Sequence, residues 1–449
     1  MIFIYFSFLH LYASDADFDE IEKIDAGFRV SFVNVGQGNG VVAIDTMTGK
    51  RLLIDAGSSK HPTNPHTGEV ILAFNSIKPY MEFLPNLLSV HPIVFICSHA
   101  DKDHLNLFSD FINDSRDKLS INPSLSFYLG GSFEKYLFSK DSLAFFDSIL
   151  TLPSANVFSL SHDLSIIEMQ GLKSYLEEQK AVIGIATGYE GIEEALMRMT
   201  RLRIKDKVRP FILRSKLKDF STEGRVMVEI LGANAGHSPT RNYESTGCFE
   251  EETPPIRGEI INHEENMSSC VMRIIFYDTF SIIITGDATG ITTDRIIHNF
   301  SFIGSPYNSL LCHILLTCHH GAITEESNNY EWVFAIQPVY AFFSSGKYRG
   351  YNHPQFDAIY NYSNSPRIKK DITEHVIVCG RNKEKDSHGA KTQARIINVG
   401  EYEFIKTYKK LDTDWHKLTT SYGIFSTHSS GSIICNIGVS GVMEALDFA

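Results

Sequence analysis

Two histidines and two aspartates fall close together in the segment HADKDH at residues 99–104, as His99, Asp101, Asp103 and His104. Imidazole and carboxylate groups bind divalent cations, and neighbouring side chains of a loop can turn toward one or two ions. The segment could instead be the charged start of a helix, but a helix cap does not need two histidines at this spacing. The spacing therefore predicts a metal site.

Further candidate ligands follow apolar segments later in the chain. Asp287 comes after the apolar run 281–285 and a glycine, although an aspartate there could also cap the helix predicted from about residue 292. His319 and His320 follow the apolar run 311–317. Because neighbours in an extended chain point to opposite sides, we expect one of them to bind metal and the other to face substrate or pack.

His353 lies in an Asn-His-Pro segment and is the most distant candidate. A histidine in this position could grip an anionic group or move a proton. It could equally be a histidine of a surface loop, and the sequence leaves both interpretations open.

Most of these residues follow segments with the pattern of strands. Residues 92–97 form a continuous apolar run, typical of a strand covered on both faces. Alternation and turn residues predict a meander over 28–55, and strands over 225–231, 270–276, 281–285, 311–317, 337–344 and 431–437. Both halves repeat the order strand, strand, acid-rich loop, helix, which favours an α/β fold in which two stacked sheets have helices outside.

Residues 118–225 have a different pattern, with helical periodicity near 134–150, 166–179 and 192–203 and no site motif. We interpret them as a mainly helical insertion or lid on one domain that spans 26–449. An independent second domain is the alternative.

The composition restricts the class of protein. The 449 residues have a formal charge of −12, so nucleic acid could bind only through a local groove or bound metal. Seven cysteines without paired spacing favour a reducing compartment and a cytoplasmic location. Residues 1–25 form a separate N-terminal segment whose apolar start, 1–13, resembles part of a signal peptide or an edge strand. That start is too short to span a bilayer, and no integral membrane protein is expected.

The order of the motifs carries a family resemblance. GQGNG at 36–40, LLIDAG at 52–57, SHADKDH at 98–104, SIIITGDAT at 281–289, CHHGA at 318–322 and SSGKYRGYNHP at 344–354 follow one another along the chain. Together they resemble the metallo-β-lactamase superfamily, and within it the hydrolase domain of the ComEC-like proteins of competence DNA uptake. Six ordered motifs are far more specific than any one of them.

The resemblance implies a four-layer αββα sandwich that holds two divalent metal ions. Aspartate at position 101, where the superfamily commonly has histidine, makes manganese a rival to zinc. The superfamily histidine that precedes the Gly-Asp strand has no clear match here, since His237 and His263 align poorly. By resemblance, metal would be held by His99, Asp101, Asp103, His104, Asp287 and one of His319 and His320, with support from Asp55, Asn266, Ser269 and Lys347.

These residues imply a metal-dependent hydrolase. Water activated by the ions would attack the substrate, Asp103 would orient or deprotonate that water, and His353 or Lys347 would stabilise the developing charge. A phosphodiesterase or nuclease is the first hypothesis. Hydrolysis of a lactone, thioester or other small ester is the second, because fold does not fix function and the acidic charge favours a small substrate. A non-catalytic metal-binding module is the third, and the oligomeric state is left open.

Overall fold

A computed structural model gives the fold. It describes residues 26–64, 67–83, 88–131, 136, 140–159, 167–168, 215–217, 220–222, 224–233, 235, 266–301, 310–346, 353–379, 395–399, 402–406 and 415–449. The predicted N-terminal segment 1–25 lies outside these residues, as do His237, His263 and Lys347. None of the described helices has the length and hydropathy to cross a membrane.

The first sheet has nine strands in the order β20-β19-β1-β2-β3-β4-β5-β6-β7. The opening meander is present as antiparallel pairs, and β3 to β6 run parallel. The strands are β1 (Ala26–Phe32), β2 (Gly40–Asp45), β3 (Arg51–Ala56), β4 (Ile93–Cys97), β5 (Leu125–Leu129), β6 (Ala155–Ser159), β7 (Ile167–Glu168), β19 (Ile433–Gly438) and β20 (Met443–Phe448).

The second sheet has seven strands in the order β18-β13-β12-β11-β10-β9-β8. Its strands β11, β12, β13 and β18 run parallel. The strands are β8 (Ser215–Lys216), β9 (Val226–Gly232), β10 (Val271–Phe276), β11 (Phe280–Ile284), β12 (Ile314–Leu316), β13 (Tyr340–Phe343) and β18 (Ile424–Ser426). Two further pairs lie outside both sheets, β14 (Lys370–Cys379) with β17 (Trp415–Tyr422) and β15 (Arg395–Val399) with β16 (Tyr402–Lys406).

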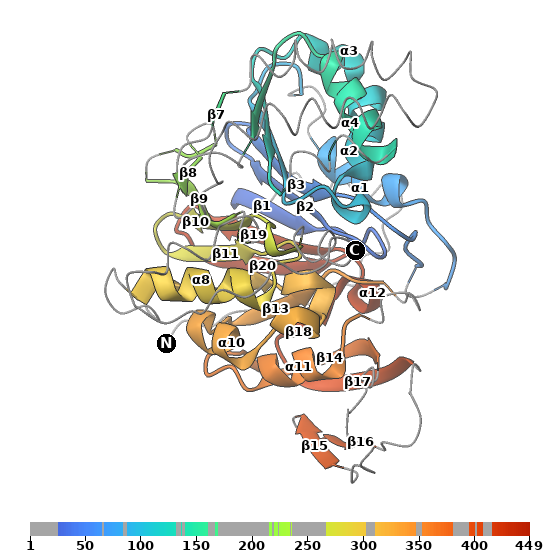
Figure 1. The fold of residues 1–449 in the computed structure, drawn as a ribbon, viewed down its shortest axis with the longest axis vertical. Coiled ribbons are helices and arrows are strands. Elements are labelled where there is room, and N and C mark those ends of the chain that lie inside the picture. The colour runs from blue at the N-terminus through green and yellow to red at the C-terminus, as the bar shows by residue number, and fades with distance from the viewer. Residues whose placement is uncertain are drawn as a thin grey trace, which may run out of the picture.

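Three apolar clusters build the layers. One packs the first sheet against helices α1 (Ala73–Met81), α2 (Lys102–Asp114), α3 (Arg116–Ser120) and α4 (Lys140–Leu150). A second cluster draws its members from both sheets, with the rings of Phe32 and Phe342 at 4.9 Å. The third packs the second sheet against α8 (Gly290–Ser301), α10 (Tyr330–Ile336) and α11 (Phe356–Ser363). The chain is thus an α/β sandwich with two sheets and helices on their outer faces (Figure 1).

The described part of residues 118–225 contains strands of the first sheet as well as α4, which overlaps the helical stretch predicted near 134–150. β5 and β6 continue the parallel strands of the first sheet, and only α4 between them is helical. Residues 125–129 are buried throughout, but Ser126 interrupts their apolar run, so they lack the continuous apolar pattern that marked β4. Residues 169–214 lie outside the described part, so the insertion stays a prediction.

Candidate metal centre

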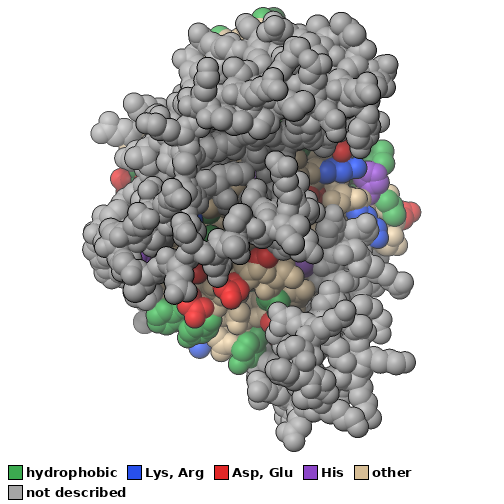
Figure 2. Space-filling model, in the orientation of Figure 1, with side chains coloured by type: hydrophobic (Ala, Val, Ile, Leu, Met, Phe, Trp, Pro, Cys, Tyr) green, Lys and Arg blue, Asp and Glu red, His purple; other side chains and the backbone are tan. Residues whose placement is uncertain are grey.

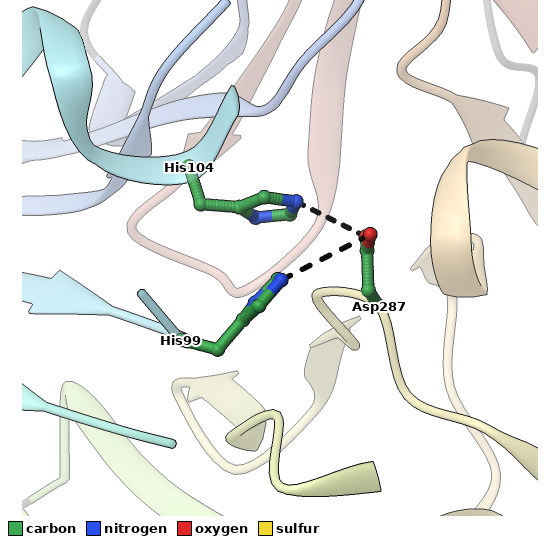
Figure 3. A group of neighbouring side chains, drawn as sticks. All are labelled: His99, His104 and Asp287. Atoms are coloured by element: carbon green, nitrogen blue, oxygen red, sulfur yellow. Dashed lines mark ion pairs between the residues drawn. The ribbon is translucent and has the colours of Figure 1, made fainter. Parts of the chain in front are cut away.

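The candidate ligands meet where parallel strands of both sheets end. Asp55 is the penultimate residue of β3, the HADKDH segment follows β4, Asp287 follows β11, and the two adjacent histidines follow β12. The carboxyl ends of parallel strands share an edge of a sheet, which is where α/β folds commonly bind ligands. Stacking the two sheets brings their two edges together. Side chains nearly two hundred residues apart in sequence are thereby in contact (Figure 3).

Asp287 lies at the centre of the cluster and is only 4% exposed. Its Oδ1 lies 3.1 Å from Nε2 of His104 and 3.4 Å from Nε2 of His320. Its Oδ2 lies 4.0 Å from Nε2 of His99 and 3.7 Å from Nε2 of His319. Four imidazoles therefore direct the same ring nitrogen toward one carboxylate.

Two overlapping groups have a spacing that suits a metal ion. His99, His104 and Asp287 form one, and Asp103, His104 and His320 form the other; within each, the ligand atoms lie within 4.8 Å of one another. Ligand bonds of about 2 Å place ligand atoms on opposite sides of an ion about 4 Å apart, so these groups fit one. Asp103 Oδ2 lies 3.6 Å from Nε2 of His320.

Asp101 occupies the N-cap position of α2, but its side chain makes no capping hydrogen bond. Its side chain is 45% exposed, and Oδ2 lies 3.6 Å from Nε2 of His99. The alternative interpretation of the segment as a helix start is thus correct for the backbone. The aspartate side chain is directed to the cluster and not to the helix amides.

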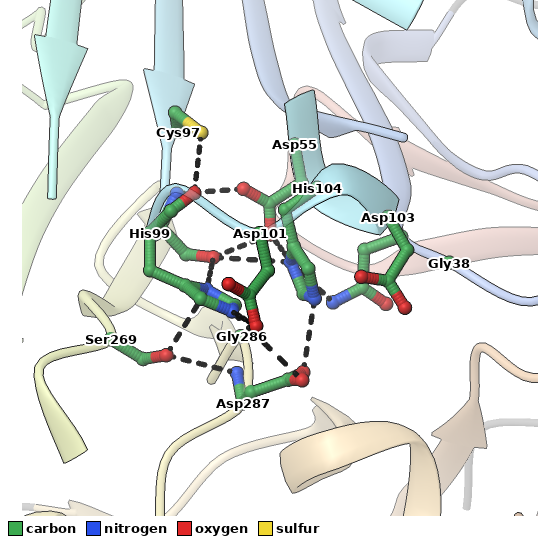
Figure 4. A network of polar contacts seen from close by, with 12 residues as sticks. Gly38, Asp55, Cys97, His99, Asp101, Asp103, His104, Ser269, Gly286 and Asp287 are labelled. Atoms are coloured by element: carbon green, nitrogen blue, oxygen red, sulfur yellow. Dashed lines mark hydrogen bonds and ion pairs between the residues drawn. The ribbon is translucent and has the colours of Figure 1, made fainter. Parts of the chain in front are cut away.

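Three histidines, His99, His104 and His320, are held through Nδ1 and leave Nε2 toward the cluster. Figure 4 shows His99 and His104 in this arrangement. Nδ1 of His104 lies 2.8 Å from the Asp55 carboxylate, and Nδ1 of His320 lies 2.6 Å from the Ser344 carbonyl oxygen. Nδ1 of His99 lies between two serine hydroxyls, Ser98 at 3.0 Å and Ser269 at 3.2 Å. Among the described residues, none of the three Nε2 atoms has a hydrogen-bond partner. Histidines that bind metal characteristically use the second nitrogen in this way.

Two glycine-bearing loops position Asp103 and the start of α2. We call residues 36–40 the glycine loop. Its Asn39 N–H donates to the Asp103 carbonyl at 2.9 Å. A Cβ at Gly38 or at Gly57 would collide with the Asp103 backbone. Only glycine allows these loops to approach α2 so closely.

Strained backbone occurs at the same place. Asp55 has φ +50° and Gly286 has φ +53°, and a Cβ on Gly286 would lie 2.7 Å from the Ser98 side chain. Asp55 accepts from both the N–H and the hydroxyl of Ser98, at 2.7 and 2.8 Å. Non-glycine residues with positive φ persist where the surroundings fix them, and they gather at functional sites.

Electrostatics keep the carboxylates of the cluster charged. Burial alone would raise the pKa of Asp103, but the contact with His320 and the charge of His104 lower it to about 2. The pKa of Asp287 lies well below its usual range, because the charges of His320, His104 and His319 outweigh its burial. Burial lowers the pKa of His104, but the charges of Asp287 and Asp55 raise it well above its usual value. The cluster therefore favours positive charge between its carboxylates.

His353 lies beside the cluster and is 5% exposed, which excludes the interpretation as a surface-loop residue. Its ring centroid is 5.3 Å from that of His319. Burial first, and then the charges of His319 and His320, hold its pKa well below the usual value. A neutral imidazole in this position can accept a proton.

The residues predicted to support the site, Ser269 and Asn266, differ in what they contact. The Ser269 hydroxyl contacts His99 and accepts from the Asp287 N–H at 3.2 Å, whereas the main-chain carbonyl of Asn266 accepts from the Ser269 N–H at 3.1 Å. Sequence reasoning did not select Ser98 or Ser344, which hold His99 and His320. Ser98 stands inside the motif and could have been found there. Ser344 acts through its carbonyl oxygen, which every residue type has, so no sequence signal exists.

Comparisons with known proteins assign no family. No protein-family model matches the chain, and no curated protein matches it. A solved structure, described as a protein of unknown function from Enterococcus faecalis V583, is similar at 11% identity and a TM-score of 0.26. The match covers 65% of this chain and 49% of that one, so the chain spans about half the length of that protein.

Proposed function

We propose that the chain is a metal-dependent hydrolase with the αββα sandwich of the metallo-β-lactamase superfamily. The observation that carries the proposal is the set of three buried histidines whose Nδ1 atoms are held and whose Nε2 atoms converge beside Asp287. The order of the six motifs and the position of helices outside both sheets support it. A purely structural cluster would leave fewer polar atoms without partners, because buried polar groups are costly unless paired.

The cluster suits two divalent ions. Its ligands are imidazole nitrogen and carboxylate oxygen, which favour zinc, and the three candidate carboxylate ligands Asp101, Asp103 and Asp287 keep manganese as a rival. Divalent ions bound here would lower the pKa of a coordinated water toward neutrality and stabilise negative charge on the substrate. Asp103 and His353 lie beside this position, where the carboxylate can orient a nucleophile and the neutral imidazole can take up a proton.

We propose a phosphodiester as the substrate. Attack on phosphorus places negative charge on non-bridging oxygens, and a cationic cluster is the environment that stabilises such charge. A nucleic acid would have to present a single segment to the site, since the net charge of −12 repels a long polyanion.

A small ester or lactone is the second candidate, and one observation favours it. Asp294, Glu326 and Glu331 are exposed, and Figure 2 shows acidic side chains on the face that carries α8 and α10. Glu325, next to Glu326 in sequence, acts electrostatically on His319. Acidic groups so close to the cluster disfavour an extended anionic substrate.

The test combines metal content with hydrolysis. The purified protein, loaded with zinc or manganese, is assayed on bis-nitrophenyl phosphate, single-stranded DNA and a lactone. Asp103→Ala and His104→Ala should abolish hydrolysis of whichever substrate is turned over. His298→Ala, which removes an exposed imidazole on α8, should change nothing. Less than about one metal ion per chain, or full activity in both cluster variants, would overturn the proposal and leave a non-catalytic module.

A further inference from the structure

The two oxygens of Asp287 divide the surrounding histidines into pairs. Oδ1 faces His104 and His320 at 3.1 and 3.4 Å, and Oδ2 faces His99 and His319 at 4.0 and 3.7 Å. One imidazole nitrogen can bind one ion, whereas a carboxylate can bridge two through its separate oxygens. The pairing thus divides the ligands into two sets around one bridging residue.

Adjacent histidines reach the same carboxylate because of an unusual turn. His319 has φ 47° and ψ 49°, and His320 has φ 54° and ψ 18°, so both are left-handed. An extended chain would direct the two rings to opposite sides. A left-handed backbone costs a non-glycine residue about 1–2 kcal/mol, and here two successive residues adopt it.

The rest of the protein fixes this turn against the residue that precedes Asp287. The His319 N–H donates to the Gly286 carbonyl at 3.0 Å, and the His319 carbonyl accepts from the Ala322 N–H at 2.8 Å. The turn and the bridging carboxylate therefore belong to one hydrogen-bonded unit. Strain retained in such a unit indicates that both side chains are needed where they are.

We propose, on the basis of the proposed function, that His319 and His320 both bind metal, one on each side of Asp287. His319 joins His99 and Asp101 on the Oδ2 side, and His320 joins His104 and Asp103 on the Oδ1 side. Each side then has two imidazoles and a carboxylate besides the bridge. This differs from the expectation that only one of the two adjacent histidines is a ligand.

The two sides differ in how firmly they are held. Nδ1 of His104 and of His320 has an oxygen at 2.8 and 2.6 Å, whereas Nδ1 of His319 has no hydrogen-bond partner among the described residues. The side chain of Asp101 is 45% exposed, against 13% for Asp103. Loss of such outer contacts weakens metal binding by about 10–100-fold, so the Oδ2 side is the weaker one.

The experiment counts ions in variants that keep the turn. Asparagine tolerates the left-handed region, so His319→Asn and His320→Asn remove each imidazole without imposing a new backbone. Protein stripped with a chelator is titrated with Zn²⁺ by calorimetry, and bound metal is counted after desalting. The parent should bind two ions with affinities at least about tenfold apart. His319→Asn should lose the weaker ion and keep the tighter one, and His320→Asn should weaken the tighter one at least tenfold.

Two measurements keep the result clear. His298→Asn, an exposed histidine on α8, should bind as the parent does, and His319→Gly repeats the test without an amide oxygen that could substitute as a ligand. Circular dichroism confirms that each variant is folded. Two ions bound by His319→Gly with parental affinity, or a parent that binds a single ion, would overturn the inference. A parent that binds two ions but hydrolyses nothing would refute the proposed function and leave this assignment intact.

Discussion

Replacing Asp55 by asparagine should weaken metal binding through the tautomer of His104. The Asp55 carboxylate accepts three hydrogen bonds, from the Ser98 N–H at 2.7 Å, the Ser98 hydroxyl at 2.8 Å and Nδ1 of His104 at 2.8 Å. An amide of the same shape has one oxygen and one NH₂ group. It cannot accept at both ends, so one of the two N–H groups loses its acceptor.

The two orientations of the amide have different consequences. With its oxygen toward Ser98, the NH₂ group donates to Nδ1 of His104 and shifts the ring proton to Nε2, where it points at Asp287 and blocks ligation. With its oxygen toward His104, the ring can bind metal, but the buried Ser98 N–H faces a donor, which costs about 1–3 kcal/mol. The metal-free variant takes the first orientation, and metal binding forces the second. The free-energy difference between the two orientations, about 1–3 kcal/mol, therefore opposes metal binding. Because 1.4 kcal/mol is a factor of ten, the affinity for Zn²⁺ should fall about 5–150-fold.

Chelator competition measures this change, and Asp45→Asn is the matched control. Asp45 is also buried and charged, with Arg225 at 2.9 Å and the Met47 N–H at 3.0 Å, but it lies at the opposite end of β2 from the cluster. Its variant should lose stability without losing affinity for Zn²⁺. Unchanged affinity in Asp55→Asn, or an equal loss in Asp45→Asn, would refute the tautomer reasoning.

Three further predictions concern the elements around the cluster. Gly286→Ala places a Cβ on a backbone with positive φ and 2.7 Å from the Ser98 side chain, so the variant should bind metal less well and lose about 2–5 kcal/mol of unfolding free energy in a denaturant titration. Gly224→Ala, with φ +69° and open space around the Cβ, is the control and should lose only about 1–2 kcal/mol. Ser344→Ala removes the hydroxyl that donates 2.7 Å to the glycine loop, and calorimetry should show weaker binding of the tighter ion, while unchanged binding would contradict a positioning role. The pKa of His104 is raised because the charge of Asp287 outweighs burial, so protonated His104 stabilises the metal-free protein fully below about pH 6.5, and this stabilisation is lost at higher pH. The denaturation midpoint of the metal-free protein should therefore fall between pH 6 and pH 9, and this fall should be smaller in His104→Asn.

Local sequence signals located the strands and the ends where ligands gather. The apolar run at 92–97 is β4, and the run at 281–285 overlaps β11, because strands buried on both faces or alternating with turns leave a clear pattern. Residue types with metal chemistry directly after such runs were sufficient to select Asp287 and the histidines. The hydrophobic content of 43% is enough to build the three clusters of buried apolar residues.

Long-range pairing could not be read in the same way. β19, near the C-terminus, pairs with β1 and extends the first sheet on that side, and this register depends on contacts about four hundred residues apart in sequence. β5 and β6 are short and follow helical residues, so their membership of the first sheet is determined by the neighbours they pair with and not by their own pattern. The sequence pattern therefore did not show that residues 125–129 and 155–159 belong to the first sheet.

The roles of individual histidines depend on backbone geometry that composition does not encode. His319 and His320 are equivalent in sequence, yet only the latter has its Nδ1 atom against a carbonyl oxygen, and both reach Asp287 because both are left-handed. The turn is fixed by the Gly286 carbonyl, and that glycine is in turn required by the closeness of Ser98. The ligand loops of the two sheets are thus packed against each other, since Gly286 follows β11 of the second sheet and Ser98 follows β4 of the first. A substitution between the sheets that alters their separation should disturb metal binding before it unfolds the chain, because ligand distances tolerate only a few tenths of an ångström.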